Sequence, residues 1–409
     1  MQVMSTGLVV KIKSTIASFL IYIYRLTFFI PKKKNLILFG SMNGKRYGDN
    51  SRHLFEWVLK NKPNIKAVWV TNSNEIKIML ENRNLPVVKS LSVKGFLTFS
   101  RAALACYTNS FLDITFDYRA VPSSLKLIAL RHGRGIKGVR FARQNHKIPE
   151  PEKIQRLKES KLILKSIACS EFQADIQEMC LLIGREKHKV TGYPRNDWVL
   201  KNADKRDTIW SSNFENDVPS FSILYAPTWR HGREPTKFFP FSDFDKTEFI
   251  ELLESIDGVL LLRPHVNDLA YHELKEFLEF LCKDNDRIRF CTHNEVIDVN
   301  TILPAIDLLV TDWCSIEHDY ILLNRPILYI PYDYYDFKKN NGFLYDYYDN
   351  LSGPTVDSFK NFAEWINKFY KDRKLYSLER NRLLNKIHYY HDAKSCERVY
   401  DFILSEIVE

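Results

Sequence analysis

The sequence predicts an α/β protein with two halves, each a parallel sheet between crossover helices. Short apolar runs alternate with stretches of helical length, which is typical of doubly wound sheets. A polar stretch at 202–219 interrupts this alternation, which then restarts. Apolar residues make up 45% of the 409 residues, enough for two large cores. We therefore expect two Rossmann-like domains facing a cleft, with ligands at the carboxyl ends of the strands.

The first half, residues 35–204, begins with the apolar run 35–39 and a glycine-containing turn. Asp49, Asn50 and Ser51 follow and offer an N-cap for a helix that ends near residue 60. The other expected elements are the strands 66–71, 85–88, 103–107 and 125–130 and the helices 74–81 and 93–101.

The second half, residues 220–409, is expected to follow a linker at 205–219. Its expected strands are 221–225, 259–262, 288–290, 308–311 and 327–330, and its expected helices are 246–255, 268–281 and 315–323. The tail at 358–390 is expected to be helical throughout.

Residues 1–34 are predicted to associate with a membrane surface. The stretch 15–30 is apolar, contains Arg25 and has lysines on both sides. It is short for a span of about 20 residues, and no small-residue cleavage site follows it. Basic flanks around a short apolar helix are typical of an interfacial helix. The alternative is an ordinary core helix.

The composition and the missing motifs limit which partners and which enzyme classes fit this sequence. A net charge of +9 favours anionic partners, which include phosphates, nucleic acid and acidic membranes. Seven scattered cysteines without a C-x-x-C pair indicate reduced thiols and support neither a zinc site nor a disulfide framework. No metal and no cofactor are expected. The chain has no P-loop, G-x-G-x-x-G, H-E-x-x-H or G-x-S-x-G motif, so P-loop kinases, dehydrogenases, zincins and α/β-hydrolases are disfavoured.

The most basic cluster is RHGRGIKG at 131–138, directly after the expected strand 125–130. Its glycines allow the backbone to approach a ligand closely. No acid interrupts the basic residues between 126 and 147, which favours phosphate binding by Arg131, Arg134 and Lys137. His132 is a candidate general base or phosphate ligand. A nucleic-acid or membrane patch with an incidental histidine is the alternative.

Three further clusters follow strands of the second half. YAPTWRHG at 225–232 offers Thr228 and Arg230 to a phosphate, and RPH at 263–265 places Arg263 beside His265, which is either structural or functional. VTDWCS at 310–315 opens a helix whose first amides, with the Ser315 hydroxyl, form either a phosphate cradle or an ordinary cap. Its other candidate ligands are Thr311, Asp312, Glu317 and Asp319, the last two either complementing the helix dipole or binding a ribose hydroxyl.

Taken together, these clusters resemble the CDP-glycerol glycerophosphotransferase family, which comprises the wall teichoic acid primases and polymerases and their relatives in capsule synthesis. The resemblance covers about 35–390. It rests on GKRYGDN from Gly44, HG at His132, GYPRND from Gly192, YAPTWR from Tyr225, RPH at Arg263 and TDWCSIEHDYILLNRPILYIPYD from Thr311.

The resemblance implies a GT-B-like fold with the nucleotide held by the C-terminal domain. It also implies metal-independent transfer of glycerol phosphate from CDP-glycerol to a hydroxyl of a membrane-linked polymer or lipid-linked primer, with release of CMP. His132 matches the proposed base, His265 matches the histidine that contacts the pyrophosphate, and Thr311, Asp312 and Ser315 fall in the diphosphate loop. Family members work at the cytoplasmic membrane face, so a peripheral location on an anionic surface is expected, and nucleic acid is not expected as a partner.

The sequence departs from the family on the expected acceptor side and in the phosphate loop. Arg131 replaces the usual tryptophan, GRGIK at 133–137 replaces G-T-P-L-K, and Cys314 replaces one of two serines. Three alternatives stay open: a CDP-ribitol or other alditol donor, a GT-B glycosyltransferase or sugar-nucleotide epimerase, and a nonenzymatic basic module.

Overall fold

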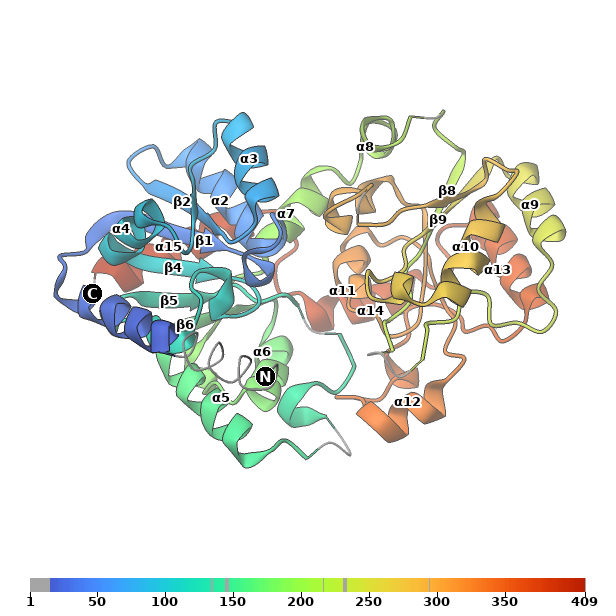
Figure 1. Cartoon of the computed structure of the whole chain (residues 1–409). Coiled ribbons are helices and arrows are strands. Elements are labelled where there is room, and N and C mark those ends of the chain that lie inside the picture. Colours follow the sequence, from blue (N-terminus) through green and yellow to red (C-terminus); the bar gives the residue numbers. More distant parts are fainter. Residues whose placement is uncertain are drawn as a thin grey trace, which may run out of the picture.

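The fold is that of a computed structural model, which describes residues 15–133, 135–143, 147–215, 217–230, 234–293 and 295–408. Two sheets form two lobes, and every strand pair in them is parallel (Figure 1). The predicted fold class is therefore confirmed. The carboxyl ends of the strands, where the polar clusters follow, face the region between the lobes.

The N-terminal sheet has the strand order β3-β2-β1-β4-β5-β6-β7. Its strands are β1 (Lys33–Gly40), β2 (Lys66–Thr71), β3 (Val87–Lys89), β4 (Ala102–Tyr107), β5 (Lys126–Ala129), β6 (Lys165–Ala168) and β7 (His188–Val190). Its helices are α2 (Asp49–Asn61), α3 (Asn74–Asn82), α4 (Val93–Arg101), α5 (Glu150–Leu162), α6 (Glu171–Leu181) and α7 (Pro194–Lys201). The sequence patterns missed β6 and β7 because each is only three or four residues long and carries polar side chains.

The C-terminal sheet has the order β10-β9-β8-β11-β12. Its strands are β8 (Phe221–Tyr225), β9 (Gly258–Leu262), β10 (Ile288–Phe290), β11 (Leu308–Thr311) and β12 (Ile327–Tyr329). The helices around it are α8 (Arg206–Asn213), α9 (Lys246–Ser255), α10 (His272–Cys282), α11 (Ile316–Tyr320), α12 (Tyr334–Asn341), α13 (Phe359–Lys371) and α14 (Ser377–Ile387). All five strands lie where the sequence predicts them, because each is a short, fully apolar or nearly apolar run.

Two predicted boundaries are wrong. The expected linker contains α8, which buries Ile209 and Trp210 in the core of the C-terminal domain. The last helix, α15 (Ser395–Val408), leaves the C-terminal domain and packs on the N-terminal one, where Val399 joins the core (Figure 1). The Asp197 carboxylate accepts hydrogen bonds from the first two amides of α15, at 2.8 Å each. The tail predicted to be helical throughout is broken at 372–376.

The segment 15–26 is helical and docks on the N-terminal domain. Its Ile21 and Tyr24 are buried, and the Tyr24 ring packs against Phe96 and Phe99 of α4. The Tyr24 hydroxyl donates to the carbonyl of Ser90 at 3.0 Å. Among the described residues, no helix combines the length and the apolar character that crossing a bilayer requires.

The glycine-rich loop after β5 joins the two domains. Ile136 inserts into the core of the C-terminal domain, and its carbonyl accepts a hydrogen bond from the Leu344 amide at 2.7 Å. Gly135 lies so close to Ser315 that an added Cβ would be 3.1 Å from the Ser315 Cα. The absence of a side chain at Gly135 therefore allows this loop to close against the start of α11.

Candidate active site

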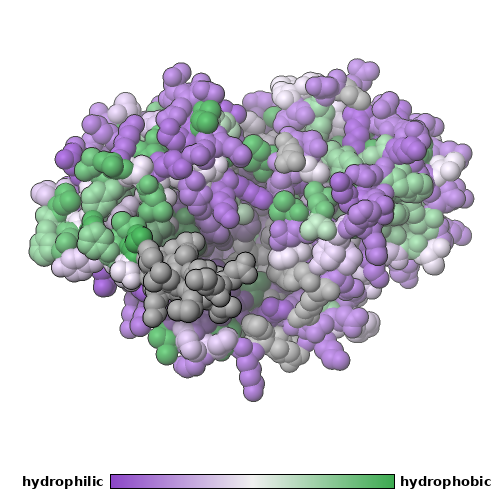
Figure 2. All heavy atoms as spheres, in the orientation of Figure 1, coloured by the Kyte–Doolittle hydropathy of each residue, from purple (hydrophilic) through white to green (hydrophobic). Residues whose placement is uncertain are grey.

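Two adjoining cavities occupy the cleft between the domains, with volumes of about 180 Å³ and 110 Å³. The molecular surface is hollowed between the two lobes (Figure 2). Both cavities are lined by the same six residues from the two domains: His132, Arg195, Arg263, His293, Val299 and Asn300. The larger cavity also contains His265, Ser315 and Asp319, so the two predicted histidines face one space.

His132 is held by a chain of charged groups that crosses the domain interface. Its Nδ1 contacts the Asp49 carboxylate, whose other oxygen accepts from Arg195 Nη1 at 2.7 Å. The same guanidinium pairs with Asp319 of the C-terminal domain, at 2.9 Å from Nη2. Arg195 also donates to the His132 carbonyl at 2.8 Å, which positions the backbone of the histidine as well as its ring.

The protonation of this chain follows from its charges. Burial would raise the pKa of Asp49, but the positive charge of Arg195 and the hydrogen bond with His132 outweigh burial and lower it to about 2. Asp49 is therefore ionised at neutral pH, and its contact with His132 requires the imidazole proton on Nδ1. The Nε2 lone pair is left available on a side chain that is 55% exposed. Such a nitrogen can accept a proton from a bound hydroxyl.

His265 has the opposite tautomer. Its Nδ1 accepts a hydrogen bond from the Asn267 amide at 3.2 Å, and its ring stacks on Trp229 with the ring centroids 4.8 Å apart. Burial, together with the charges of Lys137, Arg46 and Arg263, lowers its pKa to about 4. The ring is therefore neutral near pH 7 with its proton on Nε2, and it can donate a hydrogen bond to an anionic oxygen.

The side chain of Arg263 supports the cleft wall by binding backbone carbonyls of a neighbouring turn. Its Nη1 donates to the carbonyls of Cys291, Thr292 and Val296 at 2.6–2.7 Å, and its Nη2 contacts His293 Nδ1 at 2.9 Å. Burial and the charges of Arg263 and Arg46 lower the pKa of His293 to about 4. The predicted ligand Arg263 therefore lines the cavities while most of its donors hold the 291–296 turn.

Several predicted ligands lie behind the cavity wall instead of in it. Asp312 accepts from the Thr228 hydroxyl at 2.7 Å and from Arg230 Nη1 at 2.7 Å, and Arg230 also pairs with Asp333. Thr311 donates to the Ala226 carbonyl at 2.8 Å. Thr228, Arg230, Thr311 and Asp312 are at most 3% exposed and, within the described residues, line neither cavity. These contacts support the cavity wall, and direct binding of these four residues to a ligand stays a prediction.

Two further predictions need correction. Glu317 is buried against the hydroxyls of Tyr329 and Ser352, and burial raises its pKa to about 7, so it is not aimed at a ribose. Asp319 reaches the cavity but is paired with Arg195. Ser315 lines the cavity, and its side chain makes no capping hydrogen bond to the short helix α11. Of this group, Ser315 is the side chain placed to meet a ligand.

The side chains of the basic cluster after β5 point in different directions, some towards the cleft and some away from it. Lys137 lies close enough to His265 for its charge to add to the lowering of that pKa by burial, and close enough to Cys314 to oppose part of the rise that burial causes in the thiol pKa. Arg131 turns away from the cleft, and its Nε donates to Ser166 of β6 at 2.7 Å. Arg134 lies outside the described residues. The cluster therefore supplies one described cation, Lys137, to the C-terminal side of the cleft.

The sequence patterns missed Asp49, Arg195 and His293 as site residues. Asp49 is predicted as a helix cap, yet α2 begins after Gly48 without a side-chain cap, and the Asp49 backbone has a φ of 61°. Both Asp49 and Arg195 belong to stretches that carry the family resemblance, GKRYGDN and GYPRND, which was the available signal. His293 follows a short strand and stands in no such stretch.

Two Rossmann-like domains around a cleft, with an Asp–His pair facing a neutral histidine, are the arrangement of a GT-B-like enzyme. Comparison with known proteins makes this specific. The family model described as CDP-Glycerol:Poly(glycerophosphate) glycerophosphotransferase matches residues 22–405. The chain therefore belongs to this glycerophosphotransferase family and is an enzyme of the transferase class.

Individual relatives agree with this assignment. The teichoic acid glycerol-phosphate transferase of Staphylococcus aureus is 28% identical over 89% of this chain and 94% of its own length. The teichoic acid poly(glycerol phosphate) polymerase of Bacillus subtilis is 24% identical over 91% of this chain, which spans only 49% of that relative. The solved structure of the wall teichoic acid polymerase TagF superposes with a TM-score of 0.77 at 20% identity, covering 97% of this chain and 96% of that one, and supports the fold.

Proposed function

We propose that this chain transfers glycerol phosphate from CDP-glycerol to a hydroxyl of a membrane-linked polymer or lipid-linked primer and releases CMP. The observation that carries the proposal is the pair of histidines in one cavity, with opposite tautomers set by Asp49 and by the Asn267 amide. One ring can accept a proton while the other donates one, as phosphoryl transfer between two oxygens requires.

In the proposed reaction, His132 Nε2 takes the proton of the acceptor hydroxyl as its oxygen attacks the β-phosphorus. The bond between that phosphorus and the oxygen bridging to CMP breaks, and the electron pair leaves with CMP. In this proposal His265 Nε2–H and the Ser315 hydroxyl, which both line the larger cavity, stabilise charge on the diphosphate oxygens, and the Lys137 ammonium near His265 adds to this. A positioned general base contributes about a hundredfold to ten-thousandfold.

The donor is tested by CMP release from purified protein offered CDP-glycerol, CDP-ribitol and UDP-sugars in parallel, with membrane extract as acceptor. Release from CDP-glycerol alone is expected. Preference for CDP-ribitol would keep the mechanism and change the donor, since the same residues can act on the diphosphate of either CDP-alditol. Activity with a UDP-sugar and none with either CDP-alditol would refute the proposal.

We further propose that the enzyme works on the membrane surface through the helix 15–26 and α4. The outer face of this helix exposes Ile16, Phe19 and Tyr22, each more than half exposed, and Val93 of α4 is 78% exposed beside it. Apolar side chains gather over this part of the N-terminal lobe (Figure 2). Exposed basic residues border the patch: Arg25, Lys33, Lys34 and Lys94. An apolar face with a basic border suits an anionic bilayer at the cytoplasmic face of the cell membrane.

A further inference from the structure

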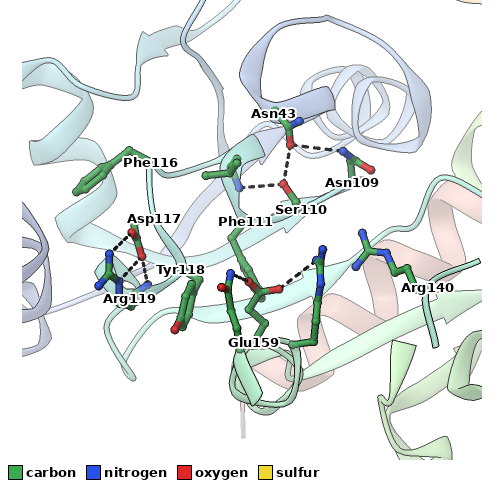
Figure 3. Close-up of a pocket in the computed structure, with 13 residues that line it drawn as sticks. Asn43, Asn109, Ser110, Phe111, Phe116, Asp117, Tyr118, Arg119, Arg140 and Glu159 are labelled. Carbon is green, nitrogen blue, oxygen red and sulfur yellow. Dashed lines mark hydrogen bonds and ion pairs between the residues drawn. The ribbon is translucent and has the colours of Figure 1, made fainter. Parts of the chain in front are cut away.

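A polar pocket of the N-terminal domain lies outside the cleft and takes no part in the mechanism above. Its volume is about 610 Å³, and it opens at the carboxyl edge of the sheet, beyond β1 and β4 (Figure 3). Its walls come from the loops after β1, β4 and β5 and from α5. Because four separate chain segments converge on it, the pocket is part of the fold and not a gap within one loop.

The floor of this pocket is held rigidly. The Asp113 carboxylate accepts hydrogen bonds from the amides of Asn43, Thr108 and Asn109 at 2.6–2.9 Å, so one buried group ties the loop after β1 to the loop after β4. The Ser110 hydroxyl donates to the Asn43 side-chain oxygen at 2.6 Å (Figure 3). These hydrogen bonds fix a polar floor under the pocket, and a fixed polar surface suits a hydroxyl-rich ligand.

The charges of the pocket favour an anion that also carries hydroxyls. Three arginines, Arg119, Arg140 and Arg156, line it against the carboxylates Asp117 and Glu159. Arg119 is paired with Asp117 at 2.8 Å, whereas Arg156 is only 3.4–3.5 Å from its carboxylate neighbours. A guanidinium with such long contacts can turn towards a phosphate, and a carboxylate beside it can accept from a polyol hydroxyl.

A buried arginine stands behind this pocket. Arg140, Arg156 and Glu159 also line a narrow inner recess of about 40 Å³, whose wall includes Arg131. Arg131 is 7% exposed, and its Nη2 is buried without a hydrogen-bond partner. Burial also lowers the pKa of this guanidinium. Buried cations normally have an anionic partner, and among the described residues no carboxylate pairs with Arg131, so its charge points to a site whose negative charge comes from a ligand.

The position of the pocket connects it to the reaction. Arg131 and His132 are consecutive, so their side chains mark two sides of one backbone segment, the first beside the recess and the second in the cleft. On the outer side, Phe116 lines the pocket and its ring packs on Tyr24 of the N-terminal helix, with the centroids 5.1 Å apart. The pocket thus lies between the apolar outer face of the domain and the proposed base.

We propose that this pocket is an acceptor subsite, which binds a phosphate group and neighbouring hydroxyls of the acceptor away from the hydroxyl that reacts. This inference rests on the proposed function. The shared chemistry, a phosphate ester beside polyol or sugar hydroxyls, has two possible sources: the head group that joins the acceptor to its lipid, and the earlier units of the polymer. The experiment below distinguishes them.

The test uses the full chain and two synthetic acceptors that end in the same glycerol phosphate. One is tri(glycerol phosphate) free in water, and the other is this trimer joined through a sugar diphosphate to a long alkyl chain. Arg156→Gln and Arg140→Gln are each expected to raise the acceptor KM about tenfold or more, the loss typical of one charge-assisted hydrogen bond. The kcat and the KM for CDP-glycerol are expected to stay within twofold.

Arg185→Gln is the matched control. Its side chain is 32% exposed and pairs with two carboxylates, compared with 31% and two carboxylates for Arg156, but it does not line the pocket. A higher KM for both acceptors assigns the bound phosphate to the polymer, and a higher KM for the alkyl acceptor alone assigns it to the head group. Unchanged KM values for both acceptors in both variants would overturn the subsite. Wild-type protein that releases no CMP from CDP-glycerol would instead refute the proposed function.

Discussion

Replacing Asp49 by asparagine tests the proposed general base more sharply than removing His132 itself. Asparagine has nearly the volume of aspartate, and its oxygen can still accept from Arg195. Its amide, however, would donate towards His132 Nδ1, where the carboxylate now accepts. The imidazole would then carry its proton on Nε2, the nitrogen that must receive the acceptor proton. We therefore expect kcat to fall between about a hundredfold and ten-thousandfold.

The same substitution has a predictable effect on stability. The pKa of Asp49 is about 2 in the folded protein, compared with an ordinary value of 3.8. Because the folded-state pKa is depressed, the ionised form stabilises the fold at neutral pH, by about 2 kcal/mol. This contribution is present above about pH 4 and is lost as the pH falls towards 2. Asp49→Asn should therefore melt at a lower temperature than the wild type at pH 7, with the difference shrinking in acid.

The assay is acceptor-dependent CMP release, measured with a thermal melt of the same sample. Asp197→Asn is the control, since Asp197 is also buried and binds the amides of α15 without contacting His132. It should lower stability while kcat stays within a few-fold of the wild type. A folded Asp49→Asn variant that retained more than a third of the wild-type kcat would refute the role given to the Asp–His pair.

Three further predictions follow from the site and the surface. His265→Phe should lower kcat/KM for CDP-glycerol about a hundredfold, because a preorganised hydrogen-bond donor is lost. Since the pKa of His265 is about 4, the ring should stay neutral between pH 6 and 9 in the wild type, and an NMR titration of His265 in that range would contradict this. Arg230→Met should lower the free energy of unfolding by about 3 kcal/mol or more in urea, because the buried carboxylate of Asp312 and the partly buried carboxylate of Asp333 both lose their partner; a loss below about 1 kcal/mol would disagree. The double variant Phe19→Glu with Tyr22→Glu should lose binding to anionic vesicles in a flotation assay, while CMP release with a soluble acceptor continues. Phe280→Glu, on the other lobe, is the control, and equal vesicle binding by the wild type and both variants would exclude the proposed surface.

The sequence alone determined the fold class and the two histidines of the cleft. The five strands of the C-terminal sheet were predicted because short apolar runs bounded by polar residues are local signals. His132 and His265 each follow an expected parallel strand, which favours a place at the cleft, and the family resemblance implied their roles as base and pyrophosphate contact. Both predictions depend on short stretches of sequence taken one at a time: an apolar run in the first case and a motif after a strand in the second.

Only the tertiary structure decided which groups act on those histidines. Asp49 and Arg195 are 146 positions apart, and Asp319 reaches the same guanidinium from the other domain. No local pattern specifies such a partner, because it depends on how two domains close. The same closure placed Arg230 and Asp312 behind the wall, returned α15 to the first domain and turned Arg131 away from His132. The periodicity of a strand or helix depends on neighbouring residues and can be seen in the sequence. The pairing of buried charges depends on how the whole interior packs.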